Sequence, residues 1–125
     1  MTIKEQVLDA MNGRVDNEKK NFQKNLANVL NDFEHFFIYQ ADIAYKSSRM
    51  IKIISDTMVF IQNQDERVIP SMIQNERDYH LQQLVNGQVI TSSTNHLYNL
   101  SQNYERQINQ ELYKFYAALY ASIIK

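Results

Sequence analysis

Apolar residues between positions 22 and 61 recur at alternating steps of three and four residues. This row consists of Phe22, Leu26, Val29, Phe33, Phe36, Ile43, Met50, Ile54 and Ile61. A second row at seven-residue spacing runs beside it through Leu30, Phe37, Ala44, Ile51 and Met58. Such spacing is typical of one broad apolar stripe on a helix that packs against other helices. It predicts a long helix from about residue 16 to residue 64, whose stripe is interrupted by the polar residues Gln40, Ser47 and Thr57.

A helix of that length would be about 70 Å long, because each residue adds 1.5 Å. A compact chain of this size has a diameter of roughly 35 Å. The molecule is therefore expected either to be elongated or to contain a break in this helix. Ser47-Ser48 is the favoured break, because serine hydroxyls compete for backbone hydrogen bonds. A short first helix is predicted from Thr2 to Met11, ending at Asn12-Gly13, since glycine suits a helix end.

Two more helices are predicted in the second half of the chain. Pro70 suits the first turn of a helix that runs to about Asn86, with Asn86-Gly87 as its C-terminal cap. Thr91 to Thr94 offers N-caps for a last helix, from about residue 95 to 124. That helix carries one stripe formed by Leu97, Tyr104, Ile108, Leu112, Phe115, Leu119 and Ile123, and a second row formed by Tyr113, Tyr116 and Tyr120.

The predicted fold class is all-α: an elongated helical bundle or coiled-coil-like hairpin of two long helices with shorter helices. One helical domain is expected over residues 1–125. An α+β alternative stays open at this stage, because the dense apolar runs at about 50–62 and 80–92 also suit short β-hairpins. The presence of only two glycines and one proline favours helices over a many-stranded fold.

Composition narrows the function classes only slightly. Apolar residues make up 44% of the 125-residue chain and charged residues 22%, as in ordinary globular proteins. The net charge of −1 gives no overall attraction to nucleic acid, so a nucleic-acid partner is not the favoured prediction. Cysteine is absent, so disulfides and thiolate metal sites are excluded. No apolar run is long enough to span a bilayer, and no signal-peptide core is found, so a cytoplasmic location is expected.

No residue pattern indicates catalysis, a cofactor or a metal. The histidines are His35, His80 and His96; Glu76 and His80 are spaced i, i+4 and would share a helix face, whereas Glu34 and His35 are adjacent and point to different faces. Two ligands are too few for a stable metal site. The two glycines are isolated, so no phosphate-binding loop can form. The protein is therefore expected to be no enzyme, with no catalytic residue, no cofactor and no metal.

The tyrosine row and the centre of the apolar stripe are the candidate binding residues. Tyrosine offers a large contact area and a hydroxyl group, and it is enriched at interfaces. The same rings would also widen the core face of a packed helix, and the apolar stripe likewise suits either a bundle within one chain or a seam between chains. The residues predicted to bind a partner are Tyr113, Tyr116, Tyr120, Phe36, Phe37 and Gln40.

The function predicted from these features is a non-enzymatic protein–protein interaction protein, such as an adaptor, chaperone, inhibitor or immunity-type protein. It would act by docking helix faces, and self-association into a homodimer is expected. The alternative is a dimeric nucleic-acid-binding regulator that uses Lys46, Arg49 and Lys52, which share a helix face. A charged face that only keeps the helix solvated is the simpler interpretation of these three residues.

Overall fold

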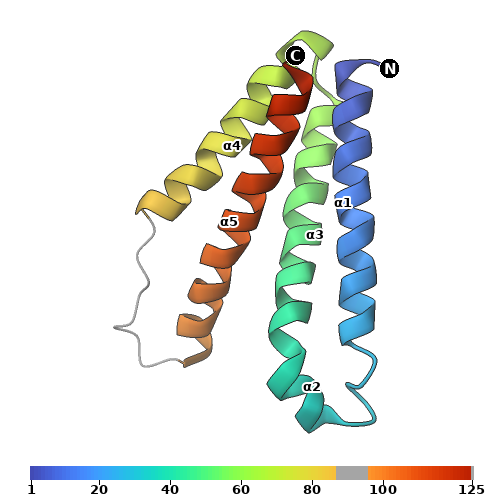
Figure 1. Cartoon of the computed structure of the whole chain (residues 1–125), viewed down its shortest axis with the longest axis vertical. Helices are drawn as coiled ribbons and strands as arrows, with labels where there is room; N and C mark the ends of the chain where they lie inside the picture. Colours follow the sequence, from blue (N-terminus) through green and yellow to red (C-terminus); the bar gives the residue numbers. More distant parts are fainter. Residues whose placement is uncertain (87–95, 125) are drawn as a thin grey trace. The chain divides into compact units, whose positions relative to one another are not determined.

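The computed structural model describes residues 1–86 and 96–124, and the chain is almost entirely helical within these ranges (Figure 1). No β-strand occurs among the described residues, so the predicted all-α class is confirmed and the α+β alternative is wrong. Residues 50–62 lie in one helix and residues 80–86 in another. The rest of the second proposed hairpin lies outside the described residues, as do Gly87 and the predicted caps at 91–94.

The chain divides into two compact units, Met1–Gln64 and Asp65–Lys125, which we call unit 1 and unit 2. Each unit contains one pair of long helices in contact along their lengths. The expectation of one domain over residues 1–125 stays a prediction. The two units are described in turn.

Unit 1 is an antiparallel pair of long helices joined by a turn and a short helix. Helix α1 spans Ile3–Asn25, α2 spans Phe33–Tyr39 and α3 spans Ala41–Gln62 (Figure 1). Side-chain hydrogen bonds fix the opposed directions, because they join position 4 to 62, 21 to 47 and 28 to 40. The buried residues lie on one face of each long helix: Val7, Met11, Val15 and Asn25 on α1, and Ala44, Ser47, Met50, Ile54 and Ile61 on α3.

Helix α1 does not end at Asn12-Gly13, as the sequence had suggested, but continues through both residues. Glycine in a helix interior costs roughly 0.5–1 kcal/mol relative to alanine. The buried side chains of Met11 and Val15 lie on either side of Gly13, so a continuous helix keeps both in the core. Tertiary packing therefore outweighs the local preference of glycine for a helix end.

The predicted long helix is broken between residues 25 and 33, before the position favoured from sequence. Asn25 is buried, and its amide Nδ2 donates to the backbone carbonyl of Asn21 at 2.8 Å. Such side-chain bonds compete with the backbone bonds of a helix. Asp32 then caps α2, its side chain accepting a hydrogen bond from the backbone N–H of His35 at 3.1 Å. The apolar spacing runs through this region, but the polar residues within it end one helix and begin the next.

Ser47-Ser48, the predicted break, lies inside α3. The Ser47 hydroxyl is buried and accepts a hydrogen bond from the Asn21 amide on α1 at 2.9 Å. Gln40 makes a similar link, its Oε1 accepting from Asn28 at 3.4 Å. Two of the three polar residues that interrupt the apolar stripe, Gln40 and Ser47, therefore bind asparagines of the same chain and fix how α1 and α3 align.

Unit 2 contains a second antiparallel pair. A 3₁₀ turn, η1, spans Glu66–Val68, α4 spans Ile69–Asn86 and α5 spans His96–Ile123 (Figure 1). Pro70 lies in the first turn of α4, and α5 agrees with its predicted bounds within one residue at each end. The buried side chains of this pair are Ile69, Ile73 and His80 on α4, and Ile108, Leu112, Tyr116, Leu119 and Ile123 on α5.

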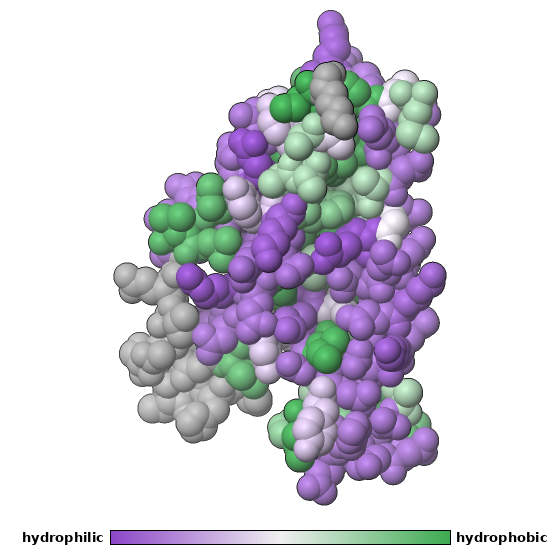
Figure 2. Space-filling model, viewed as in Figure 1, coloured by the Kyte–Doolittle hydropathy of each residue, from purple (hydrophilic) through white to green (hydrophobic). Residues whose placement is uncertain are grey.

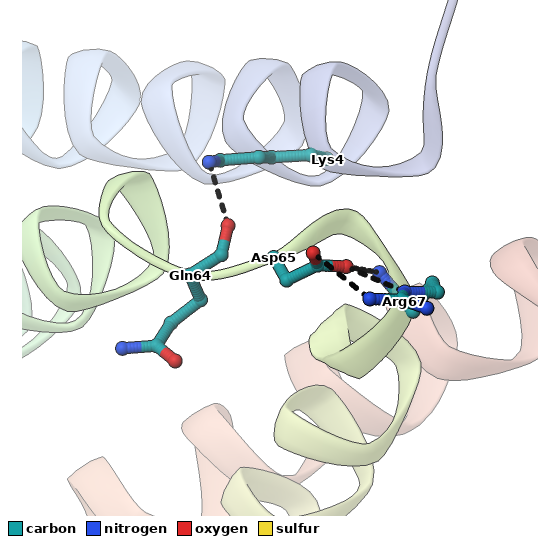
Figure 3. Close-up of polar contacts among 4 residues, drawn as sticks. All are labelled: Lys4, Gln64, Asp65 and Arg67. Carbon is teal, nitrogen blue, oxygen red and sulfur yellow. Dashed lines mark hydrogen bonds and ion pairs between the residues drawn. The ribbon is translucent and has the colours of Figure 1, made fainter.

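Polar side chains form hydrogen bonds at the end of unit 1 and at the start of unit 2 (Figure 3). The Lys4 ammonium donates to the carbonyl oxygens of Gln62 at 2.7 Å and Gln64 at 2.8 Å. Carbonyls at the end of a helix lack partners within it, so a cation there satisfies them. In unit 2, the Asp65 carboxylate accepts from the backbone N–H of Arg67 at 2.8 Å and from its guanidinium at 3.1 Å.

Candidate functional site

Helix α2 is the element whose apolar side chains are least covered. None of its seven residues is buried, and Phe36 alone among its large apolar residues is half-buried. Phe37 and Tyr39 are each 64% exposed, and Leu30 in the preceding turn is 93% exposed. Four consecutive apolar residues, 36–39, are spaced about 100° apart around the helix axis, so α3 on one side cannot cover them all and the remainder faces away from it.

The aromatic rings of α2 pack against one another, one pair stacked and two pairs tilted. The ring of Phe33 lies 6.2 Å from that of Phe37 at an interplanar angle of 26°, and 6.0 Å from that of Phe36 at 37°. His35 and Tyr39 form a further pair at 5.0 Å. Ring pairs at these separations are favourable, so the side chains form an ordered aromatic surface. We call the exposed side chains of Leu30, Phe33, Phe37, Ile38 and Tyr39 the α2 surface.

The α2 surface is large for a single chain. Its five side chains are 57–93% exposed, and together they present roughly 600 Å² if each large side chain offers about 150–250 Å². The largest apolar patch on a typical monomer is about 300–600 Å² and is often functional. Figure 2 shows hydrophobic groups among hydrophilic ones at the lower end of unit 1, where α2 lies.

The six residues predicted to bind a partner are distributed over both units. Phe37 belongs to the α2 surface, whereas Phe36 and Gln40 are half-buried beside it. On α5, Tyr116 is fully buried. Its ring therefore belongs to the core, which was the alternative role considered for the tyrosine row. Tyr113 is half-buried, as is Tyr120, whose ring lies 4.9 Å from the guanidinium of Arg77. The tyrosine row therefore serves α4–α5 packing to a large extent, and its role in partner binding stays a prediction.

Four residues of the α2 surface were not among the predicted binding residues: Leu30, Phe33, Ile38 and Tyr39. The sequence predicted an unbroken helix over residues 16–64. Such a helix would have placed most of its regularly spaced apolar residues on one buried stripe. The signal that was available is the run of asparagines at 21, 25, 28 and 31 followed by Asp32, because these residues favour helix ends and caps.

Unit 2 holds a polar cluster around the buried side chain of His80. The His80 ring is stacked on the ring of Tyr116, with centroids 5.7 Å apart and an interplanar angle of 2°. His80 Nδ1 lies 2.7 Å from Asn109 Oδ1, and the Asn109 amide donates to the carbonyl of Glu105 at 3.0 Å. Because that amide is already a donor, Asn109 Oδ1 accepts, and the Nδ1 atom of neutral His80 carries the proton.

The other ring nitrogen of His80 faces Glu76 on the same helix. Nε2 is buried without a hydrogen bond among the described residues and lies 3.7 Å from Glu76 Oε2. Burial lowers the pKa of His80 and raises the pKa of Glu76, because desolvation disfavours the charged form of each group. The predicted sharing of one helix face by these two residues is confirmed. Among the described residues, no group of three or more histidine, aspartate or glutamate side chains could hold a metal ion.

The predicted basic face of α3 is partly engaged in ion pairing. Lys52 forms an exposed ion pair with Asp56 at 3.2 Å, whereas Lys46 and Arg49 are half-buried. These contacts suit a solvated helix face, and the nucleic-acid alternative stays a prediction. No helix among residues 1–86 and 96–124 has the length and apolar character to cross a bilayer.

No protein-family model, no curated protein and no solved structure matches this chain. The α2 surface is therefore the feature of this chain that bears most directly on its function.

Proposed function

We propose that the protein is a non-enzymatic interaction protein that docks helix α2 onto a protein partner. One observation carries this proposal: a helix of seven residues, four of them aromatic, has no buried residue. Isolated helices shorter than about 12 residues are marginal in water, so such a segment gains its stability from packing. Within unit 1, helix α2 packs mainly against α3, and a partner would supply the missing cover.

The composition of the α2 surface suits a protein partner better than a lipid surface. Aromatic side chains are enriched at the centres of protein interfaces, where they act as anchors. Helices that bind anionic membranes carry lysine and arginine on their polar face. Helix α2 has neither residue, and the acidic side chains Asp32 and Glu34 accompany its rings. Negative lipid headgroups would repel α2 itself, although exposed lysines on the adjoining half of α1 would attract them.

A photo-crosslinking experiment tests the proposal on the whole chain. Replacing Phe37 by a benzoylphenylalanine residue puts a reactive ring on the α2 surface. Tyr79 on α4 is the matched control, since it is an aromatic residue exposed to a similar extent, 55% against 64%. In the native host, light should give defined protein adducts from position 37 and few from position 79.

Two results would contradict the proposal. The first is equal crosslinking from both positions, which would indicate random collisions. The second is co-flotation of the purified protein with neutral phosphatidylcholine vesicles that is lost on replacing Phe33 and Phe37 by serine. Such flotation would show that the α2 surface binds lipid.

A further inference from the structure

We infer that the partner of the α2 surface is a second copy of this chain, and that α2 of each copy meets the C-terminal half of α1 of the other. This inference rests on the proposed function and adds the identity of the partner. Two copies related by a twofold axis use the same patch on both sides, so the patch must be complementary to itself. The charges beside the α2 surface meet this requirement.

The exposed charges on α2 and its N-cap are acidic, and those on the adjoining half of α1 are mostly basic, with Asp16 as the exposed exception. Asp32 and Glu34 are exposed on the first, and Lys19, Lys20 and Lys24 are exposed on the second. Helix α1 ends at the same end of unit 1 where α2 lies (Figure 1). A twofold axis at this end would bring each acidic segment onto the basic segment of the other copy. Pairing α2 with α2 would instead place like charges together.

The area is consistent with such a dimer. A standard interface buries about 800 Å² on each partner. The α2 surface offers roughly 600 Å², because its five large side chains are mostly exposed. The stems of the three α1 lysines would supply the rest, since long basic side chains cover apolar surface while their charges stay in water. The aromatic rings would form the centre of the interface and the charges its rim.

Charge reversal in the purified full-length protein tests the inference, with solution mass measured by sedimentation equilibrium. The wild-type chain should form dimers that weaken as salt is added. Glu34→Lys should weaken the dimer about tenfold, because the altered rim contact occurs twice in each dimer. The triple variant Lys19→Glu, Lys20→Glu, Lys24→Glu should weaken it at least as much. Asp32 is left unchanged because it caps α2.

Mixing the two variants gives the decisive measurement. In a mixed dimer, the lysine that Glu34→Lys introduces into one chain would face the three glutamates introduced into the other, and the original Glu34 would face the original lysines. The mixture should therefore form dimers at least about tenfold tighter than those that either variant forms alone. Asp9→Lys is the matched control, since Asp9 is exposed on α1 about 22 Å from Lys24 at 1.5 Å per residue. This control should leave the dimer unchanged.

The possible failures separate the two proposals. The wild-type chain could stay monomeric at about 100 μM while crosslinking from position 37 captures another protein in the host. This result would contradict a second copy as the partner but would support docking by α2. Dimers that are insensitive to both charge variants, but lost in Phe33→Ser/Phe37→Ser, overturn the contact with α1. Dimers that survive all these substitutions overturn the inference, and crosslinking then decides whether α2 docks at all.

Discussion

Gly13 has no conformational or packing role that alanine could not fill. It lies inside α1 without a positive φ, and a Cβ atom added to it would meet no other atom within 4 Å. Alanine loses less conformational freedom on folding than glycine. Gly13→Ala should therefore raise the free energy of unfolding by about 0.5–1 kcal/mol, measured from the urea midpoint. The reverse change at Ala10, on the same helix, should lower it, and a destabilised Gly13→Ala would show that α1 ends near this residue.

His80 should make folding sensitive to mild acid. Burial lowers its pKa in the folded state below 6.5, so below about pH 6.5 the unfolded chain takes up a proton that the folded chain does not. Stability should therefore fall as the pH drops from 6.5 toward the lowered pKa. In His80→Gln this loss should disappear, as judged by urea midpoints between pH 7.5 and 5. An equal loss in both proteins would assign the sensitivity to another group.

Glu76 should act in the opposite direction. Its pKa is raised above 4.5 by burial, so on acidification the folded chain takes up a proton before the unfolded chain does. This uptake stabilises the protein as the pH falls through the raised pKa. Glu76→Gln should remove that gain and make the acid side of the stability curve steeper. A curve unchanged by the substitution would show that the carboxyl group is solvated.

At the scale of elements, the bounds of a helix were predicted correctly where the spacing of apolar residues alone determines them. The last helix has a dense stripe of constant spacing, and its observed bounds, His96–Ile123, agree with the expected ones. The errors lie where a small or polar side chain opposes the apolar spacing. Helix α1 continues through Gly13 because buried residues on either side of it stay in the core, and the helix ends at Asn25 although the apolar spacing continues. The exposure of α2 could not be predicted from the apolar spacing, because it depends on where the long helix breaks, which the asparagines and Asp32 decide.

The cap at Asp32 should control whether α2 stays folded. Its carboxylate accepts from the His35 N–H at 3.1 Å, and removing an N-cap costs typically about 1 kcal/mol. A helix of seven residues is only marginally stable, so the loss of this free energy would largely unfold it. Asp32→Ala should therefore speed amide exchange in α2 about fivefold and weaken dimer formation. Asp65→Ala, which removes the comparable cap of η1, is the control and should leave α2 unaffected.

At the scale of the whole molecule, two pairs of antiparallel helices follow one another along the chain, and the α2 surface belongs to the first. The polar links of unit 1, from Asn21 to Ser47 and from Asn28 to Gln40, hold α1 and α3 in one alignment at the end where α2 lies. They therefore also fix the position of the basic half of α1 relative to the acidic helix. Fold and proposed interface thus depend on the same residues.

Dimer formation through unit 1 should make the stability of that unit depend on concentration. Binding that requires the folded state stabilises it by RT ln(1 + [L]/Kd), where L is the other copy. At about ten times Kd, the slowest-exchanging amides of α1 and α3 should gain about tenfold in protection from hydrogen exchange. Phe33→Ser/Phe37→Ser should abolish the gain without unfolding the chain, because both rings are exposed. Protection that stays constant over a hundredfold range of concentration would contradict an interface between folded copies.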